Sequence, residues 1–260
     1  MLKRIFIVAI FVFFLFGCKK GEVSLKRNDN LVKYEKISIN EFYDKDATTD
    51  STYCNLSFFK ITEIKNDGLK DKINSDITNF ILSDEEGTVY ENADYFMIKY
   101  FEGYKDFCKE FPDIPQTWGM EKRANFMGVL NDTLSIEFNL YSFSGGAHPN
   151  YFTTYANYNL NSGEKLTVKD IVYDGKYEEL VKIAEEQLKK DKEIEAGFSL
   201  ADLGYYFPED TFYLPDNFLI KEKSIFFYFN IYEVAPYVLG PTEIEISFDK
   251  LTDIINFDSL

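Results

Sequence analysis

The alternation of apolar and polar residues between positions 118 and 168 predicts an antiparallel meander. In the segment Thr133–Phe143, every second residue from Leu134 to Leu140 is apolar, and the residues between are polar or tyrosine. One face of this strand is therefore expected to be buried, and the other to face solvent. Neighbouring strands are expected over 118–130, 151–160 and 165–168. Short turns rich in Asn, Asp, Ser and Gly separate these segments, as in a meander.

Apolar residues spaced three and four apart predict three amphipathic helices. The first ends near Leu82, the second runs from about Asp94 to Glu110, and the third covers Tyr177–Lys190. The apolar face of the second helix is assigned to Met97, Phe101, Tyr104 and Cys108. Further strands are expected over 52–64, 211–220, 224–232 and 243–248. This order predicts an α+β fold, with antiparallel sheets packed with a few helices in two subdomains, rather than alternating βαβ units.

The amino terminus is typical of an exported lipoprotein. Lys3 and Arg4 precede an unbroken apolar run of about a dozen residues, which is short for a membrane span of about 20 residues. Residues 15–18, Leu-Phe-Gly-Cys, resemble the lipobox of bacterial lipoproteins, in which the cysteine is lipidated. We therefore predict a signal peptide over 1–17 and a lipid on Cys18. The location would be the cell envelope outside the cytoplasm, on a periplasmic or surface face. The alternative is an uncleaved membrane anchor with an incidental cysteine.

The remaining chain divides into three predicted parts. Residues 18–50 are mostly polar and are expected to form a flexible tether. Residues 51–130 are expected to form an amino-terminal α+β subdomain, and residues 131–260 a carboxy-terminal α+β domain. A hydrophobic content of 45% supplies a core for one or two subdomains.

The charge of the chain narrows the class of partner. The formal net charge is −16, which opposes nucleic acid binding because that activity needs a basic face. It favours a cationic partner and fast, electrostatically steered association with it. The alternative is that the acid excess serves solubility alone.

Two cysteines besides Cys18 are candidates for a disulfide, Cys54 and Cys108. Export would place them where disulfides persist, although both lie in aromatic segments typical of buried free thiols. The sequence has no CxxC motif and no Cys/His ligand set, so we expect neither a metal site nor a cofactor.

A glycine loop, Ser142 to Asn150, contains the single histidine of the chain. Gly145 and Gly146 permit positive φ or a close backbone approach, and they precede His148. This histidine could act as a general base, line a binding loop, or stabilise a turn. A catalytic base needs a nucleophile and an orienting acid beside it, and the sequence shows neither. We therefore predict no catalytic residues, and treat the loop as a candidate ligand-binding segment.

A second loop runs from Tyr232 to Pro241 and carries tyrosines beside one acid. Tyr232, Glu233 and Tyr237 would make a binding rim of aromatic and carboxylate groups. The alternative is a structural crossover whose tyrosines pack on the sheet.

These two loops carry a family resemblance. The segment from Tyr141 to Val172, with its Ser-Gly-Gly-Ala-His loop, and the Tyr-Glu-Val-Ala-Pro-Tyr stretch from Tyr232 resemble a widespread extracytoplasmic domain. This domain occurs in the lysozyme-sensing anti-sigma factor RsiV, in the polysaccharide deacetylase PdaC, and in many lipoproteins. Residues 52–126 resemble the smaller domain that usually precedes it. The resemblance implies a domain that binds lysozyme in one member. In the deacetylase the catalytic metal domain is separate, and a lone histidine cannot build that site.

The sequence therefore predicts a lipid-anchored envelope protein that binds a protein or glycan, and no enzyme. A lysozyme-like cationic protein is the most concrete candidate partner. The alternative is a cell-wall glycan enzyme that uses His148 with a nearby carboxylate, and a third hypothesis is a structural component without a ligand. The enzyme hypothesis requires a carboxylate within hydrogen-bond reach of His148. The binder hypothesis requires an exposed acidic or aromatic face.

Overall fold

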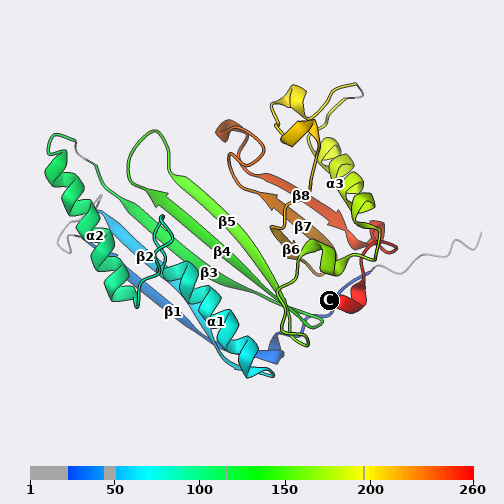
Figure 1. The fold of residues 1–260 in the computed structure, drawn as a ribbon, viewed down its shortest axis with the longest axis horizontal. Coiled ribbons are helices and arrows are strands. Elements are labelled where there is room, and N and C mark those ends of the chain that lie inside the picture. The colour runs from blue at the N-terminus through cyan, green and yellow to red at the C-terminus, as the bar shows by residue number, and fades with distance from the viewer. Residues whose placement is uncertain (1–22, 44–50, 115, 196) are drawn as a thin grey trace, which may run out of the picture.

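The computed structural model describes residues 23–43, 51–114, 116–195 and 197–260. It has two β-sheets, each with its own helical cover (Figure 1). The predicted signal peptide and Cys18 lie outside the described residues. No helix in the described ranges combines the length and the apolar character that crossing a membrane requires.

The larger sheet has five strands in the order β1-β2-β3-β4-β5. Their bounds are Val32–Phe42, Tyr53–Ile64, Gly119–Leu130, Thr133–Phe143 and Asn150–Asn159. Neighbours pair antiparallel except β2 and β3, which run parallel. The parallel pair follows from connectivity, because both helices α1 and α2 lie between these strands in the chain and return it to the same end of the sheet.

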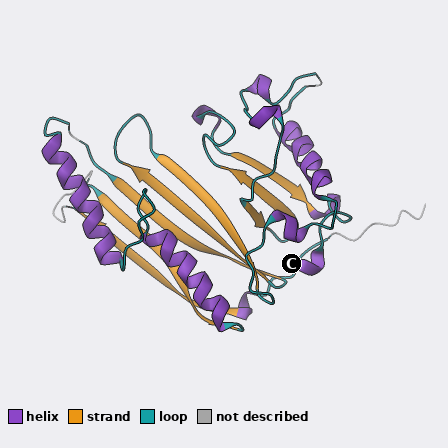
Figure 2. Ribbon diagram, in the orientation of Figure 1, coloured by secondary structure: helices purple, strands orange, loops and turns teal. Residues whose placement is uncertain are grey.

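Helices α1 (Asp67–Leu82) and α2 (Ala93–Glu110) lie on one face of this sheet (Figure 2). Each begins at an asparagine whose side chain accepts the backbone N–H three residues on, Asn66 from Leu69 and Asn92 from Tyr95. Helix α1 buries a regular stripe against the sheet: Leu69, Ile73, Ile77 and Ile81.

Helix α2 buries less than its sequence suggested. Its buried residues are Phe96 and Met97 in the first turns, whereas Cys108 is exposed. Of the predicted apolar face, Met97 is buried, Phe101 and Tyr104 are half-buried, and only Cys108 is exposed, because the end of the helix extends beside the end of the sheet (Figure 1).

The smaller sheet contains β6 (Phe218–Ile220), β7 (Ser224–Phe229) and β8 (Thr242–Ser247), all antiparallel. Helix α3 (Tyr177–Asp191) covers it and buries Leu180, Ala184 and Leu188, as its 3.6-residue period predicted. The two sheets build separate hydrophobic cores. The α+β fold is therefore confirmed.

Asparagine side chains join the two sheets where no regular strand pairing exists between β5 and β6. The Asn217 amide donates to the Thr153 carbonyl and accepts the Tyr155 N–H, both at 2.8 Å. Buried Asn157 donates to the Phe218 carbonyl at 2.8 Å, and Asn230 accepts the Thr153 N–H at 2.7 Å. These bonds satisfy backbone groups of Thr153 and Tyr155 in β5 and of Phe218 in β6 that regular strand pairing would otherwise satisfy.

The predicted division of the chain needs two corrections. The segment expected to be a flexible tether contains β1, and Leu25 before it is buried in the core of the smaller sheet. The boundary predicted at 130/131 falls in the turn between β3 and β4, which are paired along their whole length. The change of core instead follows β5, since β5 belongs to the larger sheet and α3 to the smaller.

The alternation in β4 holds for one face and fails for the other. Leu134, Ile136 and Phe138 are buried, as predicted. On the opposite face Ser135 is also buried, and its hydroxyl donates to Asn157 at 2.7 Å. The face predicted to be in solvent is therefore partly covered, because the smaller sheet packs beside it.

Two predicted strands are shorter than expected. Residues 165–168 make one isolated bridge between Lys165 and Tyr158 and then enter a 3-10 turn. Of the segment 211–220, only β6 is paired.

Candidate functional site

The glycine loop, residues 142–150, and the second loop, residues 232–241, meet in the structure. We call the second loop the tyrosine loop. The imidazole of His148 stacks on the ring of Tyr237, with centroids 3.8 Å apart and planes inclined by 18°. The Tyr232 hydroxyl lies 3.3 Å from His148 Nε2, and the two tyrosine rings are 5.7 Å apart. The structure thus brings together three of the candidate residues from segments that are distant in sequence.

Backbone geometry holds the glycine loop in place. Gly145 and Gly146 have φ of +108° and +99°, where a side chain would be strained. A Cβ on Gly145 would also collide with the Gln116 side chain, which donates to the Ser144 carbonyl. The backbone conformation of this loop therefore requires glycine at both positions.

Polar contacts made by the side chains of Tyr206 and Glu233 hold the backbone of the tyrosine loop. The Tyr206 hydroxyl lies 2.8 Å from the Tyr232 carbonyl and 3.1 Å from the Ala235 carbonyl. The Glu233 carboxylate accepts the Asn230 backbone N–H at 2.8 Å. Glu233 therefore supports its own turn, rather than pointing with the tyrosines into a common site.

Large side chains around the stacked rings are exposed. We use the term aromatic patch for His148, Tyr206, Tyr232, Tyr237, Val238 and Leu239. Val238 retains 86% of its surface and Tyr232 retains 55%. Apolar side chains gathered this way on a surface mark contact sites for partners more often than isolated ones do.

The neighbours of His148 do not form a catalytic constellation in the described part of the chain. Its recorded partners are the Pro149 carbonyl at 3.4 Å from Nδ1 and the Tyr232 hydroxyl at Nε2. Neither is the carboxylate that the enzyme hypothesis requires. Within the same described ranges, no group of three or more His, Cys, Asp or Glu side chains is arranged to hold a metal ion.

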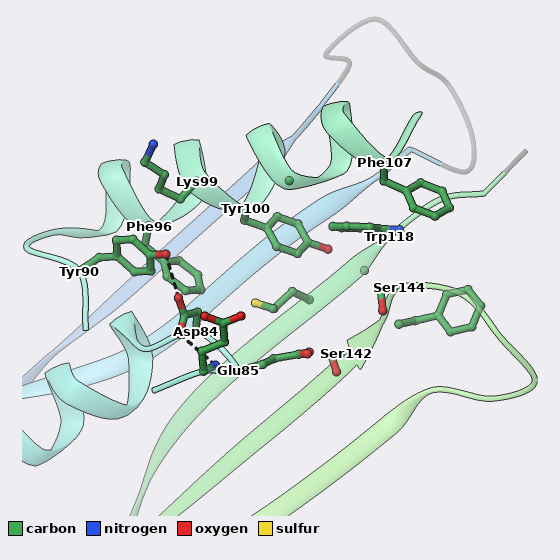
Figure 3. Close-up of a pocket in the computed structure, with 15 residues that line it drawn as sticks. Asp84, Glu85, Tyr90, Phe96, Lys99, Tyr100, Phe107, Trp118, Ser142 and Ser144 are labelled. Carbon is green, nitrogen blue, oxygen red and sulfur yellow. Dashed lines mark hydrogen bonds between the residues drawn. The ribbon is translucent and has the colours of Figure 1, made fainter. Parts of the chain in front are cut away.

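A second feature, an aromatic cleft of about 590 Å³, lies between α2 and the ends of β3 and β4 (Figure 3). Its helix side is made by Phe96, Tyr100, Gly103 and Phe107, spaced four, three and four residues apart. Trp118 and Ser142 belong to the strand side, and the loop from Asp84 to Tyr90 closes one end. This cleft was not predicted from the sequence, because the apolar face of α2 was assigned one residue further along the chain. The spacing of 96, 100, 103 and 107 was the available signal.

Two polar atoms of the cleft residues have no protein partner in the described chain. The Tyr100 hydroxyl and Trp118 Nε1 are buried, and neither has a hydrogen-bond partner among the described residues. Burial raises the pKa of Tyr100, so its hydroxyl stays protonated. The Asp84 carboxylate, by contrast, is fully engaged by the Tyr90 hydroxyl at 2.8 Å and by backbone N–H groups.

A buried lysine lies beneath the cleft. Lys122 is 4% exposed, donates to the Ser83 carbonyl, and sits 5.4 Å from the centre of the Phe96 ring. Burial lowers the pKa of Lys122 to about 8. Burial also raises the pKa of the Cys54 thiol to about 12, which makes it unreactive near neutral pH. Cys54 and Cys108 are free thiols in the structure, so the candidate disulfide is not formed.

Comparison with known families identifies two matching regions. Residues 45–151 match the family described as deacetylase PdaC, and residues 169–249 match a protein family of unknown function, DUF3298. The first region covers most of the larger sheet, and the second covers α3 and the smaller sheet.

Individual relatives cover different shares of the chain. The chain is 32% identical over 158 residues to the peptidoglycan-N-acetylmuramic acid deacetylase PdaC of Bacillus subtilis, covering 58% of this chain and 33% of that protein. It thus spans about a third of the length of that relative. Two solved structures of DUF3298 family proteins share the fold at a TM-score of 0.66. One from Bacteroides fragilis is 24% identical, and covers 89% of this chain and 96% of its own. One from Pseudomonas aeruginosa is 15% identical, and covers 89% and 98%.

Proposed function

Because the chain belongs to the extracytoplasmic domain family shared by PdaC and DUF3298 proteins, we propose that it is a lipid-anchored envelope protein that binds a cationic protein. The aromatic patch is the contact surface in this proposal, and the lipid is carried by Cys18. A lysozyme is the partner class favoured by the family resemblance.

One observation carries the proposal, which is the stack of His148 on Tyr237. It joins two loops that are 80 to 90 residues apart through half-buried rings, beside the exposed side chains of Tyr232 and Val238. Stacked rings held by backbone contacts lose little conformational entropy when a partner covers them. Tyrosine and exposed aliphatic side chains are also the types that anchor protein interfaces.

The charge around the patch supports a cationic partner. Between Glu193 and Ile220 the sequence contains acids but no Lys or Arg, and the same is true between Ser224 and Phe248. These segments supply Tyr206 and the tyrosine loop, so the parts of the chain next to the patch in sequence carry an excess of acids, although Glu245 is paired with Lys221. Such an excess raises the encounter rate with a cation and disfavours anionic partners.

The enzyme alternative has less support. The enzyme hypothesis takes its activity from the deacetylase PdaC, of which this chain spans about a third. It also requires a carboxylate within hydrogen-bond reach of His148. The described neighbours of that ring offer a hydroxyl and a carbonyl instead.

The test is direct binding of the purified protein to hen egg-white lysozyme, with association and dissociation followed separately. Tyr237→Ala removes the ring on which His148 stacks, and should speed dissociation at least about tenfold, as loss of a buried interface anchor does. Tyr173→Ala is the matched control, because Tyr173 is 45% exposed and lies outside both loops. Absence of binding at about 100 μM lysozyme, or equal effects of the two substitutions, would contradict the proposal.

A further inference from the structure

We propose that the aromatic cleft is a carbohydrate-binding site, separate from the aromatic patch, that takes pyranose rings of an oligosaccharide. The proposal rests on the shape of the cleft and on three kinds of group in its wall.

The first kind is aromatic. Trp118 lies 5.5 Å from Phe107 and 6.0 Å from Tyr100, measured between ring centroids, so these rings form a continuous wall. A pyranose ring has apolar C–H faces that pack on such walls. The cleft volume of about 590 Å³ falls inside the roughly 300–1,000 Å³ range of small-molecule sites.

The second kind is a pair of donors without acceptors. The Tyr100 hydroxyl and the Trp118 indole N–H are both buried and have no partner among the described residues, and Figure 3 shows the two side chains next to each other at the cleft. Buried polar groups that lack partners are costly and few in folded proteins. An indole N–H can only donate, so a ligand that reaches this buried group must present an acceptor.

The third kind is carboxylate. Glu85 and Glu86 line the cleft and are exposed, and in the described chain neither forms an ion pair. Lys99 also lines the cleft, and its ammonium pairs with Glu102 at 2.7 Å rather than with either of these carboxylates. Ionised carboxylates accept hydrogen bonds, so the ligand must also present donors.

A saccharide meets the three requirements together. It presents apolar ring faces to the aromatic wall, oxygen acceptors to Tyr100 and Trp118, and hydroxyl donors to Glu85 and Glu86. An apolar ligand would leave the polar groups unsatisfied. A simple cation would satisfy the carboxylates, but would leave the Trp118 N–H without an acceptor.

Gly103 keeps the cleft open. A Cβ at this position would lie 3.7 Å from the Trp118 ring, which is ordinary contact, so alanine fits and a longer side chain would occupy the ligand space. Because glycine is a poor helix former, either replacement should leave α2 at least as stable. This position therefore allows the cleft to be filled without unfolding the protein.

The experiment uses the fluorescence of Trp118, which is the only tryptophan of the chain. The purified protein is titrated with chitotetraose, and in a parallel arm with cellotetraose. We expect a saturable change in emission that Gly103→Leu abolishes and Gly103→Ala retains. Tyr100→Phe should weaken binding about fivefold, the worth of one hydrogen bond of about 1 kcal/mol.

Three results would overturn the proposal. One is no emission change with either saccharide up to about 10 mM, with the protein folded by circular dichroism. A second is an unchanged response in Gly103→Leu. The third is saturation by trilysine without a response to either saccharide, which would make the cleft a cation site. Lysozyme binding by Gly103→Leu is measured separately and should equal that of the unsubstituted protein. Failure of the cleft and failure of the patch are therefore distinguishable.

Discussion

The Asn217 side chain hydrogen-bonds to the backbone of Tyr155 as a neighbouring strand would. Its side-chain amide accepts the Tyr155 N–H and donates to the Thr153 carbonyl two residues earlier, which are the backbone groups that a paired strand engages. Asn217→Ala would leave both groups without partners between the sheets. We expect a loss of about 2–3 kcal/mol in the free energy of unfolding, measured in urea. Asn217→Asp retains the acceptor for the Tyr155 N–H and removes only the donor to the Thr153 carbonyl. It should therefore lose less free energy of unfolding than Asn217→Ala. A loss below about 0.5 kcal/mol for alanine would show that water replaces the amide.

Lys122 should make stability depend on pH above neutrality. The native side chain gives up its proton near pH 8, whereas the unfolded side chain holds it until about 10.5. The unfolded state then binds more protons in this window, so stability rises with pH between those values. Relative to Lys122→Met, the protein should gain on the order of 3 kcal/mol from pH 8 to 10.5.

Both proteins should be compared in a Cys54→Ala background, which removes titration of the neighbouring thiol. Parallel stability curves for the lysine and methionine proteins would show that Lys122 keeps an ordinary pKa.

The two faces of β4 should respond differently to truncation. Phe138→Ala removes a buried ring and should destabilise by about 3–5 kcal/mol. Glu137 lies on the other face, where its carboxylate accepts from Asn125 at 3.0 Å and from the Tyr155 hydroxyl at 3.2 Å. Glu137→Ala should therefore cost about 1–2 kcal/mol, rather than the negligible amount expected of a solvent-facing residue. Thermal unfolding of both variants checks this, and equal losses would mean that the faces are wrongly assigned.

Electrostatic steering should be visible in the kinetics of lysozyme binding. The acids flanking the aromatic patch attract a cationic partner over roughly a Debye length, which is about 10 Å at 0.1 M salt. The association rate should fall steeply from low salt to about 0.5 M, while the dissociation rate changes little. Asp210→Lys should slow association further at low salt. A salt-independent association rate would assign the acid excess to solubility.

Cys18→Ala tests the lipid anchor. The substitution should block attachment of lipid and leave an unprocessed precursor in cells, because the lipobox resemblance depends on that thiol. Metabolic labelling with a fatty acid, read against the unsubstituted protein, gives the result. Equal labelling of the two proteins would reject the lipobox assignment.

Local patterns predicted local structure where one side of an element faces a core. The stripe of α3 is an example, since Leu180, Ala184 and Leu188 all lie against the smaller sheet. The strand β1 was missed because its inner face is only partly buried and carries few large apolar residues: Val32 is buried, and Tyr34 and Ile39 are partly buried against the core. The parallel pairing of β2 with β3 joins distant segments, and no local period encodes it.

The candidate site was predicted in part for the same reason. The residues His148, Tyr232 and Tyr237 stood out because Gly, Pro and Tyr are concentrated in their loops, although their contact could not be read from the sequence. The aromatic cleft draws its walls from four segments between Asp84 and Ser144. Each segment alone is an ordinary helix face or strand end, so only their assembly reveals the cleft.

The described chain begins at one end of the smaller sheet. The Val23 N–H binds Asp249 just beyond β8, and the Leu25 N–H binds the Glu222 carbonyl in the turn before β7. The tyrosine loop connects the opposite ends of these same strands, so a strand of six residues, about 20 Å, separates it from the point where the chain enters. A protein held to a surface from its amino terminus would therefore stand on this end, with the rings of His148 and Tyr237 turned toward the surrounding medium.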